Sequence, residues 1–170
     1  MEGELLRGAP SLLFIGMPSV GKTTVGGLAA ERLGLPFIDF DEVIVRRCGM
    51  TVSQIFELKG ERYFRRLESD IAIELSSRGG LVLSPGGGIV ESNANMEFLR
   101  ARAVVCCLER DISLIDTRGR PLLKKPGAAL ELFRRRKPLY ERYADFKIEN
   151  NGSLEECVSK VVRMYLEAAL

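Results

Sequence analysis

The residues Gly16 to Thr23 fit the phosphate-binding loop pattern G-x-x-x-x-G-K-[ST] at every fixed position. Such a loop directs several backbone N–H groups and the N-terminus of the next helix at one point, which attracts an anion. Lys22 is expected to reach the β- and γ-phosphates of a nucleotide, and the Thr23 hydroxyl to ligate Mg²⁺. A Gly-rich turn before a helix is the structural alternative. The predicted nucleotide-binding residues of this stretch are Pro18, Ser19, Val20, Gly21, Lys22, Thr23 and Thr24.

Two carboxylates, Asp39 and Asp41, follow a short apolar run. On an extended strand, residues two apart share a face, so both could point into the same site. One carboxylate can then hold Mg²⁺ or its water, while the other accepts the proton of an attacking hydroxyl. The alternative is a polar strand end with a helix cap, because Asp41 precedes a predicted helix.

Arg65 and Glu68 lie three residues apart near the start of a predicted helix, where they would be neighbours. As a solvated pair they would contribute only a few tenths of a kcal/mol, on the order of 0.3. In a cleft, Glu68 would instead fix the guanidinium of Arg65 so that it grips a substrate carboxylate bidentately. The spacing leaves both interpretations open.

The triple glycine Gly86–Gly88 has no side chains to pack, so the loss of its large backbone entropy on folding needs a reason. Close approach of the backbone to a ligand is one reason, and a tight turn is another. Just before it, Ser84 occupies the strand end where many phosphate-loop proteins carry an acidic metal ligand. The metal role is therefore assigned to Thr23 and Asp39.

Basic residues gather in two later segments. The loop at 117–127 carries Arg118, Arg120, Lys124 and Lys125, and the next helix carries Arg134, Arg135, Arg136 and Lys137. A run of charges is usually a solvated face. In a kinase, a basic lid that closes over the γ-phosphate would neutralise transition-state charge and exclude water.

Composition restricts the function classes. The net charge of +2 gives no support for a nucleic-acid surface, and the basic residues lack an aromatic stacking platform. No apolar run reaches the roughly 20 residues that span a bilayer, and residues 1–10 lack a signal-peptide core. The chain has no His, so catalysis must use Asp, Glu, Lys, Arg and metal. The four cysteines show no metal-type pairing, which favours free thiols in a reducing, cytoplasmic protein.

The elements that must position these residues alternate between strands and helices, which predicts a single α/β domain over 1–170 with a parallel sheet covered on both faces. Ligands collect at the carboxyl ends of such strands, where the residues above fall. Strands are predicted at 11–15, 36–39, 81–84, 103–108 and 146–148. Helices are predicted at 24–33, over most of 42–78 with breaks near Gly49 and Gly60, and at 94–102, 111–116, 130–143 and 154–169. The segment 79–80 is expected to end the long helical region, and 117–127 to form a mobile loop.

These motifs occur in an order that closely resembles shikimate kinase over nearly the whole chain. The specific part of the resemblance is Phe64-Arg65-x-x-Glu68, the triple glycine, Arg120-Pro121-Leu122-Leu123 and Arg136-x-Pro138-Leu139-Tyr140. It implies a nucleoside-monophosphate-kinase-like P-loop NTPase fold in three layers, with a five-stranded parallel sheet of order 2-3-1-4-5. It also implies ATP-dependent phosphorylation of the shikimate 3-hydroxyl, in the pathway to chorismate and aromatic amino acids, with Mg²⁺ as cofactor and a monomeric protein.

The resemblance assigns roles residue by residue. Lys22, Asp41 and Arg120 are the implied catalytic residues, with Asp41 as candidate base and Arg120 arriving with the lid at 117–127. Shikimate is implied to contact the helical segment 41–70 and the triple glycine. The implied substrate-binding residues are Asp41, Arg65, Glu68, Gly86, Gly87, Gly88 and Arg136; Arg118 and Arg120 join the ATP-binding residues, and Thr23 and Asp39 are the implied metal residues.

The sequence departs from the family pattern at three places. Ser19 stands where relatives often carry Gly, and the stretch 108–120 is shortened, which leaves Arg118 as the candidate for packing on adenine. The turn 150–153 falls where relatives place an adenine-edge loop. Two other functions stay open at this point: a phosphate-loop kinase acting on gluconate or another hydroxy acid, and a nucleotide-binding regulatory module without turnover.

Overall fold

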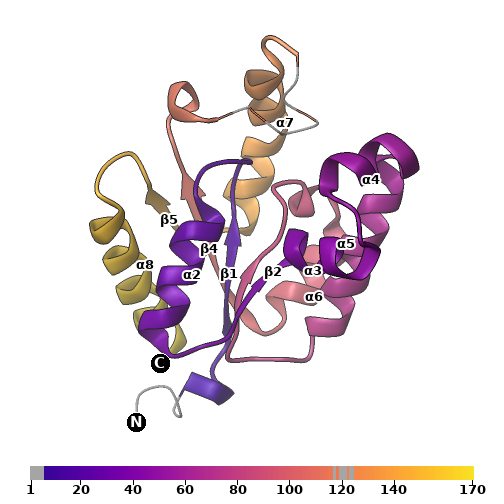
Figure 1. The fold of residues 1–170 in the computed structure, drawn as a ribbon. Helices are drawn as coiled ribbons and strands as arrows, with labels where there is room; N and C mark the ends of the chain where they lie inside the picture. The colour runs from indigo at the N-terminus through magenta and orange to yellow at the C-terminus, as the bar shows by residue number, and fades with distance from the viewer. Residues whose placement is uncertain (1–5, 117, 119–121, 123–124) are drawn as a thin grey trace.

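A computed structural model describes residues 6–116, 118, 122 and 125–170. Five strands form one parallel sheet in the order β2-β3-β1-β4-β5 (Figure 1), which confirms the predicted order. The strands are β1 (Ser11–Ile15), β2 (Phe37–Asp39), β3 (Val82–Ser84), β4 (Ala103–Glu109) and β5 (Phe146–Glu149). The order of the strands places β1, which leads into the phosphate loop, at the centre of the sheet.

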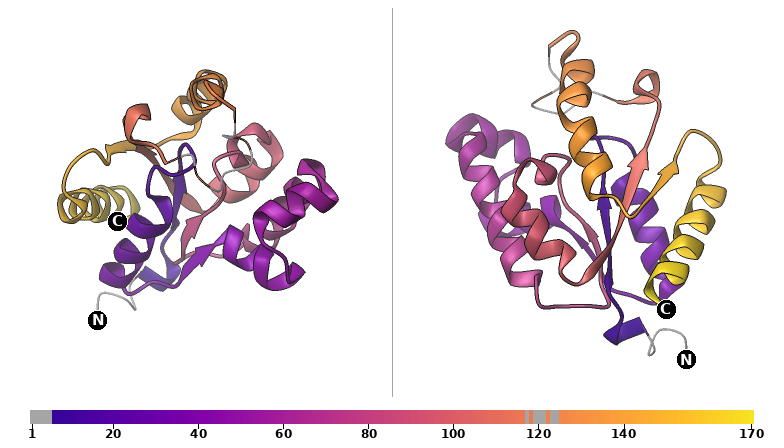
Figure 2. Two further views of the ribbon diagram at one scale, coloured as in Figure 1. Left: turned by 45° about the horizontal axis from the view of Figure 1, so that its top comes forward. Right: turned by 180° about the vertical axis from the view of Figure 1, so that it is seen from behind.

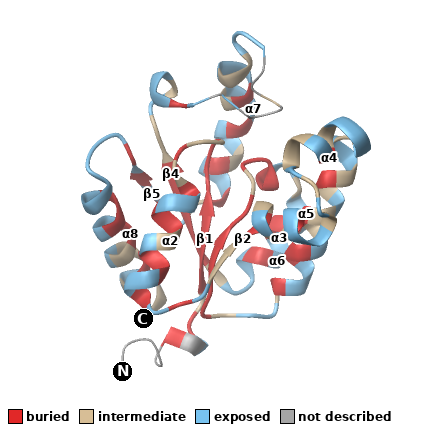
Figure 3. Ribbon diagram, in the orientation of Figure 1, coloured by how far each residue is buried: buried red, intermediate tan, exposed pale blue. Residues whose placement is uncertain are grey.

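Helices cover both faces of the sheet (Figures 1 and 2). The helices α2 (Lys22–Leu33) and α8 (Leu154–Ala169) pack against each other on one face, and α8 also contacts β4 and β5. On the other face lie α5 (Glu61–Leu75), α6 (Asn93–Arg100) and α7 (Ala128–Tyr143). Every residue of β1 is buried because both of its faces are covered, which explains its uninterrupted apolar sequence (Figure 3).

The segment 40–75 forms three helices, α3 (Phe40–Cys48), α4 (Val52–Lys59) and α5, as the breaks at Gly49 and Gly60 predicted. A capping box starts α4: the Thr51 hydroxyl accepts from the Gln54 backbone N–H, and the Gln54 side chain accepts from the Thr51 N–H. In Figure 1 these helices stand beside the sheet and reach beyond its β2 edge. They can therefore supply side chains to a site at the carboxyl ends of the strands.

Several predicted boundaries were wrong by a few residues. The first long helix begins at Lys22, inside the phosphate loop, and α5 ends at Leu75 with Ser76 as its C-cap, well before the glycines at 79–80. The helix predicted at 94–102 is α6, whose N-cap is Ser92, and the one at 111–116 is a single 3-10 turn, η3 (Ile112–Leu114). Two further 3-10 turns, η1 (Leu6–Gly8) and η2 (Ile89–Glu91), were not predicted.

Within the described residues, no helix is both long and apolar enough to cross a membrane. The four cysteines are free thiols, and Cys106, Cys107 and Cys157 are buried. Burial raises the pKa of Cys107 to about 12, so this thiol stays protonated at neutral pH.

Candidate active site

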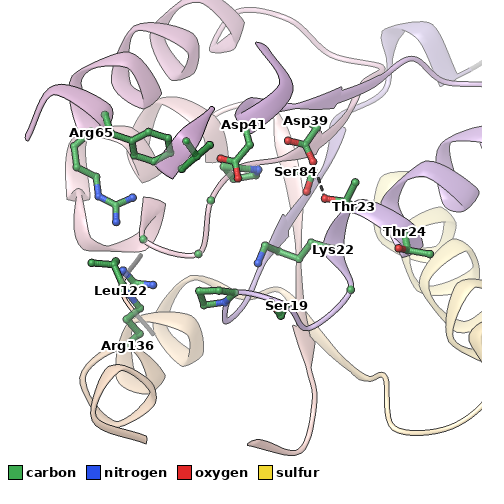
Figure 4. Close-up of a pocket in the computed structure, with 18 of the residues that line it drawn as sticks. Ser19, Lys22, Thr23, Thr24, Asp39, Asp41, Arg65, Ser84, Leu122 and Arg136 are labelled. Carbon is green, nitrogen blue, oxygen red and sulfur yellow. Dashed lines mark hydrogen bonds between the residues drawn. The ribbon is translucent and has the colours of Figure 1, made fainter. Parts of the chain in front are cut away.

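A cavity of about 370 Å³ opens at the carboxyl ends of β1, β2 and β3. Figure 4 shows its two ends: Thr23 and Asp39 lie at one, Arg65 and Arg136 at the other, and Lys22 points into the space between them. Most of the predicted site residues line this cavity. They are Pro18, Ser19, Gly21, Lys22, Thr23, Thr24, Asp39, Asp41, Arg65, Gly86, Gly87, Gly88 and Arg136.

The phosphate loop is held by contacts to its backbone. The Lys22 ammonium donates to the carbonyl oxygens of Gly16 at 2.9 Å and Met17 at 2.8 Å, across the mouth of the loop. Asn150, which directly follows β5, donates from Nδ2 to the Val20 carbonyl at 2.9 Å. Ser19 adopts a left-handed backbone with φ of 64°, which is uncommon for a residue other than Gly. The loop thus keeps its shape although its fourth position lacks the expected glycine.

Thr23 and Asp39 are brought together although they lie 16 residues apart. The Thr23 hydroxyl donates to Oδ2 of Asp39 at 2.6 Å, while Oδ1 of Asp39 accepts from the Glu42 backbone N–H at 3.2 Å. Ser84 ends β3, which pairs with β2 at the Asp39 position, and is buried. Hydroxyl and carboxylate oxygens are the ligand types that Mg²⁺ takes in phosphotransferases, so this pair fits the predicted metal site.

Asp41 reaches the cavity by a different route from the one predicted. It lies in the first turn of α3, so it does not share the face of an extended strand with Asp39. The N-cap of α3 is Asp39, and the alternative in which Asp41 caps the helix is wrong. Asp41 points toward the part of the cavity between Lys22 and Arg65 (Figure 4).

Arg65 and Glu68 form a cleft pair and not a solvated one. Nη1 of Arg65 lies 2.5 Å from Oε2 of Glu68, whose side chain is only 1% exposed, and Glu61 binds Nε and Nη2 of the same guanidinium. Burial raises the pKa of Glu68, and the charge of Arg65 opposes that rise. Burial lowers the pKa of Arg65 in turn, but the Glu68 and Glu61 carboxylates together more than offset this, so the net shift is upward. The guanidinium therefore stays charged and oriented.

The triple glycine packs closely against protein groups, so a side chain at any of its three positions would displace a neighbour. A Cβ at Gly86 would lie 2.6 Å from Oε1 of Glu68, and one at Gly88 would lie 2.6 Å from Cζ of Arg65. At Gly87 the obstacle is the phosphate loop itself, since the Gly16 carbonyl oxygen would be 2.8 Å away. None of the three glycines has a positive φ. They make room for the phosphate loop on one side and for the Arg65–Glu68 pair on the other.

Arg136 is completely buried in α7, so the charge run at 134–137 is not simply a solvated face. Its Nε and Nη2 donate to Oε2 of Glu91 at 3.1 and 2.8 Å, and the guanidinium lines the cavity. One turn later, the Tyr140 hydroxyl donates to the Gly87 carbonyl at 2.8 Å. These two contacts join α7 to the segment that follows β3.

The predicted lid is only partly described. Arg120 and Lys124 lie outside the described residues. The Arg118 side chain is 90% exposed and binds Asp116, and it does not line the cavity. Of the described residues in this segment, Leu122 lines the cavity. Lys125 is exposed.

Four polar side chains in or beside the site were given no such contact from the sequence: Glu91, Arg110, Tyr140 and Asn150. Asn150 was predicted only as part of the turn 150–153. Arg110 lines both the main cavity and a neighbouring cavity of about 260 Å³ beside the phosphate loop. Val20 also lines this neighbouring cavity. Arg110 and Asn150 directly follow β4 and β5, so their place at the carboxyl ends of strands could have indicated them. Glu91 offered no such signal, because its partner lies 45 residues away.

The apolar walls of the acceptor end come from Val52, Phe56, Phe64 and Leu122. Together with Asp41 and the two guanidiniums, they form a pocket suited to a small hydroxylated carboxylate. Its opposite end, made of the phosphate loop, Thr23 and Asp39, is suited to a nucleoside triphosphate. The geometry therefore brings an acceptor site and a phosphate site into one cavity, with Lys22 between them.

Known proteins are similar in sequence to most of this chain. Residues 18–166 match the shikimate kinase family. The chain is 39% identical to the shikimate kinase of Cupriavidus pinatubonensis, with 95% of this chain and 88% of that protein covered. It is 34% identical to the shikimate kinase of Aquifex aeolicus, with 89% and 93% covered.

Solved structures agree with this similarity. A shikimate kinase from Acinetobacter baumannii in complex with shikimate superposes with a TM-score of 0.90 at 35% identity, covering 99% of each chain. A gluconokinase from Sinorhizobium meliloti superposes with a TM-score of 0.62 at 20% identity, which shows a shared fold alone. From the matched residues, the identities over nearly the whole chain and the common architecture, this chain belongs to the shikimate kinase family.

Proposed function

We propose that this chain transfers the γ-phosphoryl group of ATP to the 3-hydroxyl of shikimate, giving shikimate 3-phosphate and ADP, on the route to chorismate and aromatic amino acids. The observation that carries this proposal is the single cavity with the phosphate loop at one end and Asp41, Arg65 and Arg136 at the other. A polyhydroxylated carboxylate needs an acceptor for its hydroxyls and guanidinium donors for its acid group, and these three side chains provide both.

In the proposed reaction, the shikimate 3-oxygen forms a bond to the γ-phosphorus while the bond from that phosphorus to the β–γ bridging oxygen breaks. The proton of the hydroxyl goes to the Asp41 carboxylate, and ADP leaves with the bridging oxygen. Lys22 is placed between the two ends of the cavity, where its ammonium can neutralise charge on the transferring group. Because such transition states can be loose, positioning of the acceptor by Arg65 and Arg136 contributes to the rate alongside proton removal.

Thr23 and Asp39 would hold Mg²⁺, Asp39 through a water molecule. When bound, this ion would neutralise charge on the β- and γ-phosphates. Among the described residues no three His, Cys, Asp or Glu side chains cluster as a self-sufficient metal site. That composition suits an ion bound mainly through substrate phosphates and one or two protein oxygens.

The remaining assignments are proposals of the same kind. Gly86, Gly87 and Gly88 line the acceptor pocket, with Glu68 orienting Arg65, and the helical segment 41–70 binds the acceptor. The segment 117–127 acts as a lid that brings Arg120 to the phosphoryl group, and Pro18 to Thr24 contact ATP, with Arg118 near the adenine. We further propose that residues 1–170 act as one monomeric, cytoplasmic kinase domain without a nucleic-acid or membrane partner.

A coupled assay of ADP release tests the proposal, with shikimate, quinate and gluconate supplied side by side at equal concentration with ATP and Mg²⁺. We expect turnover with shikimate to exceed that with the other two acceptors, because its carboxylate and hydroxyls match the acceptor end. Equal rates with all three acceptors would overturn the assignment of shikimate. Binding of ATP without transfer to any acceptor would indicate a regulatory module instead.

A further inference from the structure

Glu91 is the acidic side chain that faces Arg136, and the transfer chemistry does not require it. It ends the 3-10 turn η2, directly after the triple glycine, and 29% of its side-chain surface is exposed. Oε2 of Glu91 accepts from Nε and Nη2 of Arg136, while Oε1 lies 2.8 Å from Nε of Arg135. Both oxygens of one carboxylate are thus used to hold two successive arginines of α7.

Arg136 needs such a partner because its side chain is 0% exposed. An isolated charge at this depth would be strongly unfavourable, whereas a hydrogen-bonded carboxylate compensates much of the lost hydration. Although burial raises the pKa of Glu91, its hydrogen bonds to Arg136 and the charges of Arg136 and Arg135 lower it overall. Glu91 is therefore ionised at neutral pH and holds the guanidinium before any acceptor binds.

The geometry of the pair leaves one side of the guanidinium for the acceptor. A guanidinium has five N–H donors, one on Nε and two on each of Nη1 and Nη2. Glu91 takes the Nε and Nη2 edge. Nη1 of Arg136 is buried and makes no hydrogen bond to the part of the chain that the structure describes, and the residue lines the main cavity (Figure 4). The donors at Nη1 are therefore available to a ligand in the cavity.

Resting on the proposed function, we propose that Glu91 is a positioning residue: it fixes Arg136 so that the Nη1 side of the guanidinium meets the carboxylate of the acceptor. Arg65 is arranged in the same manner, because Glu68 and Glu61 hold its donors from the outside of the cavity. Each of the two guanidiniums at the acceptor end thus has its own acidic partner. A second cavity of about 510 Å³ is lined by Glu61, Glu68 and Glu91, and it shares Arg65 and Gly88 with the first.

The two properties of Glu91, its shape and its charge, predict opposite effects of substitution. If Glu91 acted only through its negative charge, it would repel the acceptor carboxylate, and both Glu91→Ala and Glu91→Gln would improve acceptor binding. If it positions Arg136, Glu91→Ala weakens acceptor binding, and Glu91→Gln does so less, because the amide oxygen can still accept from Nε and Nη2.

The experiment measures kcat and both KM values of the full chain, wild type against Glu91→Ala and Glu91→Gln. Removal of a charge-assisted contact predicts a rise in KM for shikimate of about tenfold in Glu91→Ala and about threefold in Glu91→Gln, with KM for ATP unchanged. Wild type should also prefer shikimate to its carboxamide, and this preference should shrink in Glu91→Ala. The matched control is Glu97→Gln on α6, an exposed glutamate that binds Asn93, for which we expect no change.

Each outcome decides the matter. An unchanged or lowered KM for shikimate in folded Glu91→Ala overturns the positioning role. An equal rise in KM for shikimate and KM for ATP, together with a lowered melting temperature, overturns it as well, because that result indicates a merely structural contact. If Glu91→Ala does not fold, Glu91→Gln decides by the same criteria. Wild type without turnover on shikimate would overturn the proposed function, whereas active wild type with unaffected variants overturns the role of Glu91 alone.

Discussion

The two ends of the cavity are formed by different kinds of chemical group, backbone at one end and charged side chains at the other. The nucleotide end is made mainly of backbone from one continuous stretch, residues 16–24, with a single carboxylate and Asn150 added from other elements. The acceptor end is made of charged side chains from α3, α5 and α7, which are far apart in the sequence. Its guanidiniums are each held by a carboxylate, whereas the loop is held through its own carbonyl groups.

This contrast has a physical basis. A phosphate is bound well by backbone N–H groups and a helix N-terminus, which need no side chains. A carboxylate on a small ring is recognised through guanidinium forks, and these are long, flexible and costly to bury without a partner. The acceptor end therefore depends on ion pairs that only the folded chain brings together, and substitutions at the two ends should have different kinetic effects.

The largest effect is expected for Lys22→Ala, which removes the ammonium that lies between the two ends. Loss of one group that stabilises developing charge lowers kcat by roughly 10²–10³-fold. The effect on KM for shikimate should be small, because Lys22 lines the phosphate loop and lies apart from the carboxylate-binding guanidiniums. Steady-state kinetics with both substrates varied measures this difference.

The control for that variant is Lys160→Ala, an exposed lysine on α8 that should leave kcat unchanged. Thermal melting accompanies both measurements. A fall in melting temperature of Lys22→Ala large enough to unfold the enzyme at the assay temperature would show that the Lys22 contacts to Gly16 and Met17 are mainly structural.

The second effect concerns the acceptor end. Arg65→Lys keeps the positive charge but replaces the fork with an ammonium, which cannot bind Glu68 and the acceptor carboxylate in the same geometry. We expect KM for shikimate to rise about tenfold, since one charge-assisted hydrogen bond contributes ~1.5 kcal/mol. KM for ATP should stay unchanged. The control is Arg66→Lys, in which KM for shikimate and KM for ATP should both stay unchanged because the Arg66 side chain is exposed. Unchanged acceptor affinity in Arg65→Lys would remove Arg65 from the carboxylate site.

The same contrast explains what the sequence could predict. The phosphate loop, the strand order and most helices were predicted, because a loop motif is local and apolar periodicity reports burial directly. The neighbourhood of Arg65 and Glu68 was also predictable from their spacing on one helix, but their burial was not, since it depends on the triple glycine packing against them. The route of Asp41 was predicted wrongly because β2 ends at Asp39 and α3 begins at once, without an intervening turn.

Two other features could not be derived from the sequence. Glu91 and Arg136 are joined only by the packing of α7 on η2, and no periodic pattern connects positions 45 residues apart. Arg118 was the predicted adenine-packing residue, but the Asp116 carboxylate binds its guanidinium and it does not line the cavity. Charge in a sequence indicates which residues can act, whereas the partners that select among them are set by tertiary contacts.

A smaller effect is expected at the nucleotide end for Asn150→Ala. This change removes the amide that donates to the Val20 carbonyl and leaves the phosphate loop less firmly held from outside. Because one neutral hydrogen bond contributes only ~1 kcal/mol, KM for ATP should rise about fivefold while KM for shikimate stays constant. The control for stability alone is Asn93→Ala, which removes the acceptor of the Tyr143 hydroxyl between α6 and α7. A rise in both KM values for Asn150→Ala would mean that the two ends are not independent.

The smallest effect should come from Ser19→Gly, which tests how far the loop depends on backbone alone. At φ of 64° a residue with a side chain is disfavoured by ~1–2 kcal/mol, and glycine removes that cost while adding roughly 0.5–1 kcal/mol of entropy loss on folding. The net gain of about 0.5 kcal/mol corresponds to a rise in melting temperature of about 1–2 °C, measured by calorimetry. Gly21→Ala is the opposite change: its Cβ would lie 2.5 Å from Nδ2 of Asn150 at φ of 103°, so it should lower the melting temperature. If Ser19→Gly instead destabilises the chain, the Ser19 side chain contributes more than its backbone strain costs, and the nucleotide end would depend on side chains as the acceptor end does.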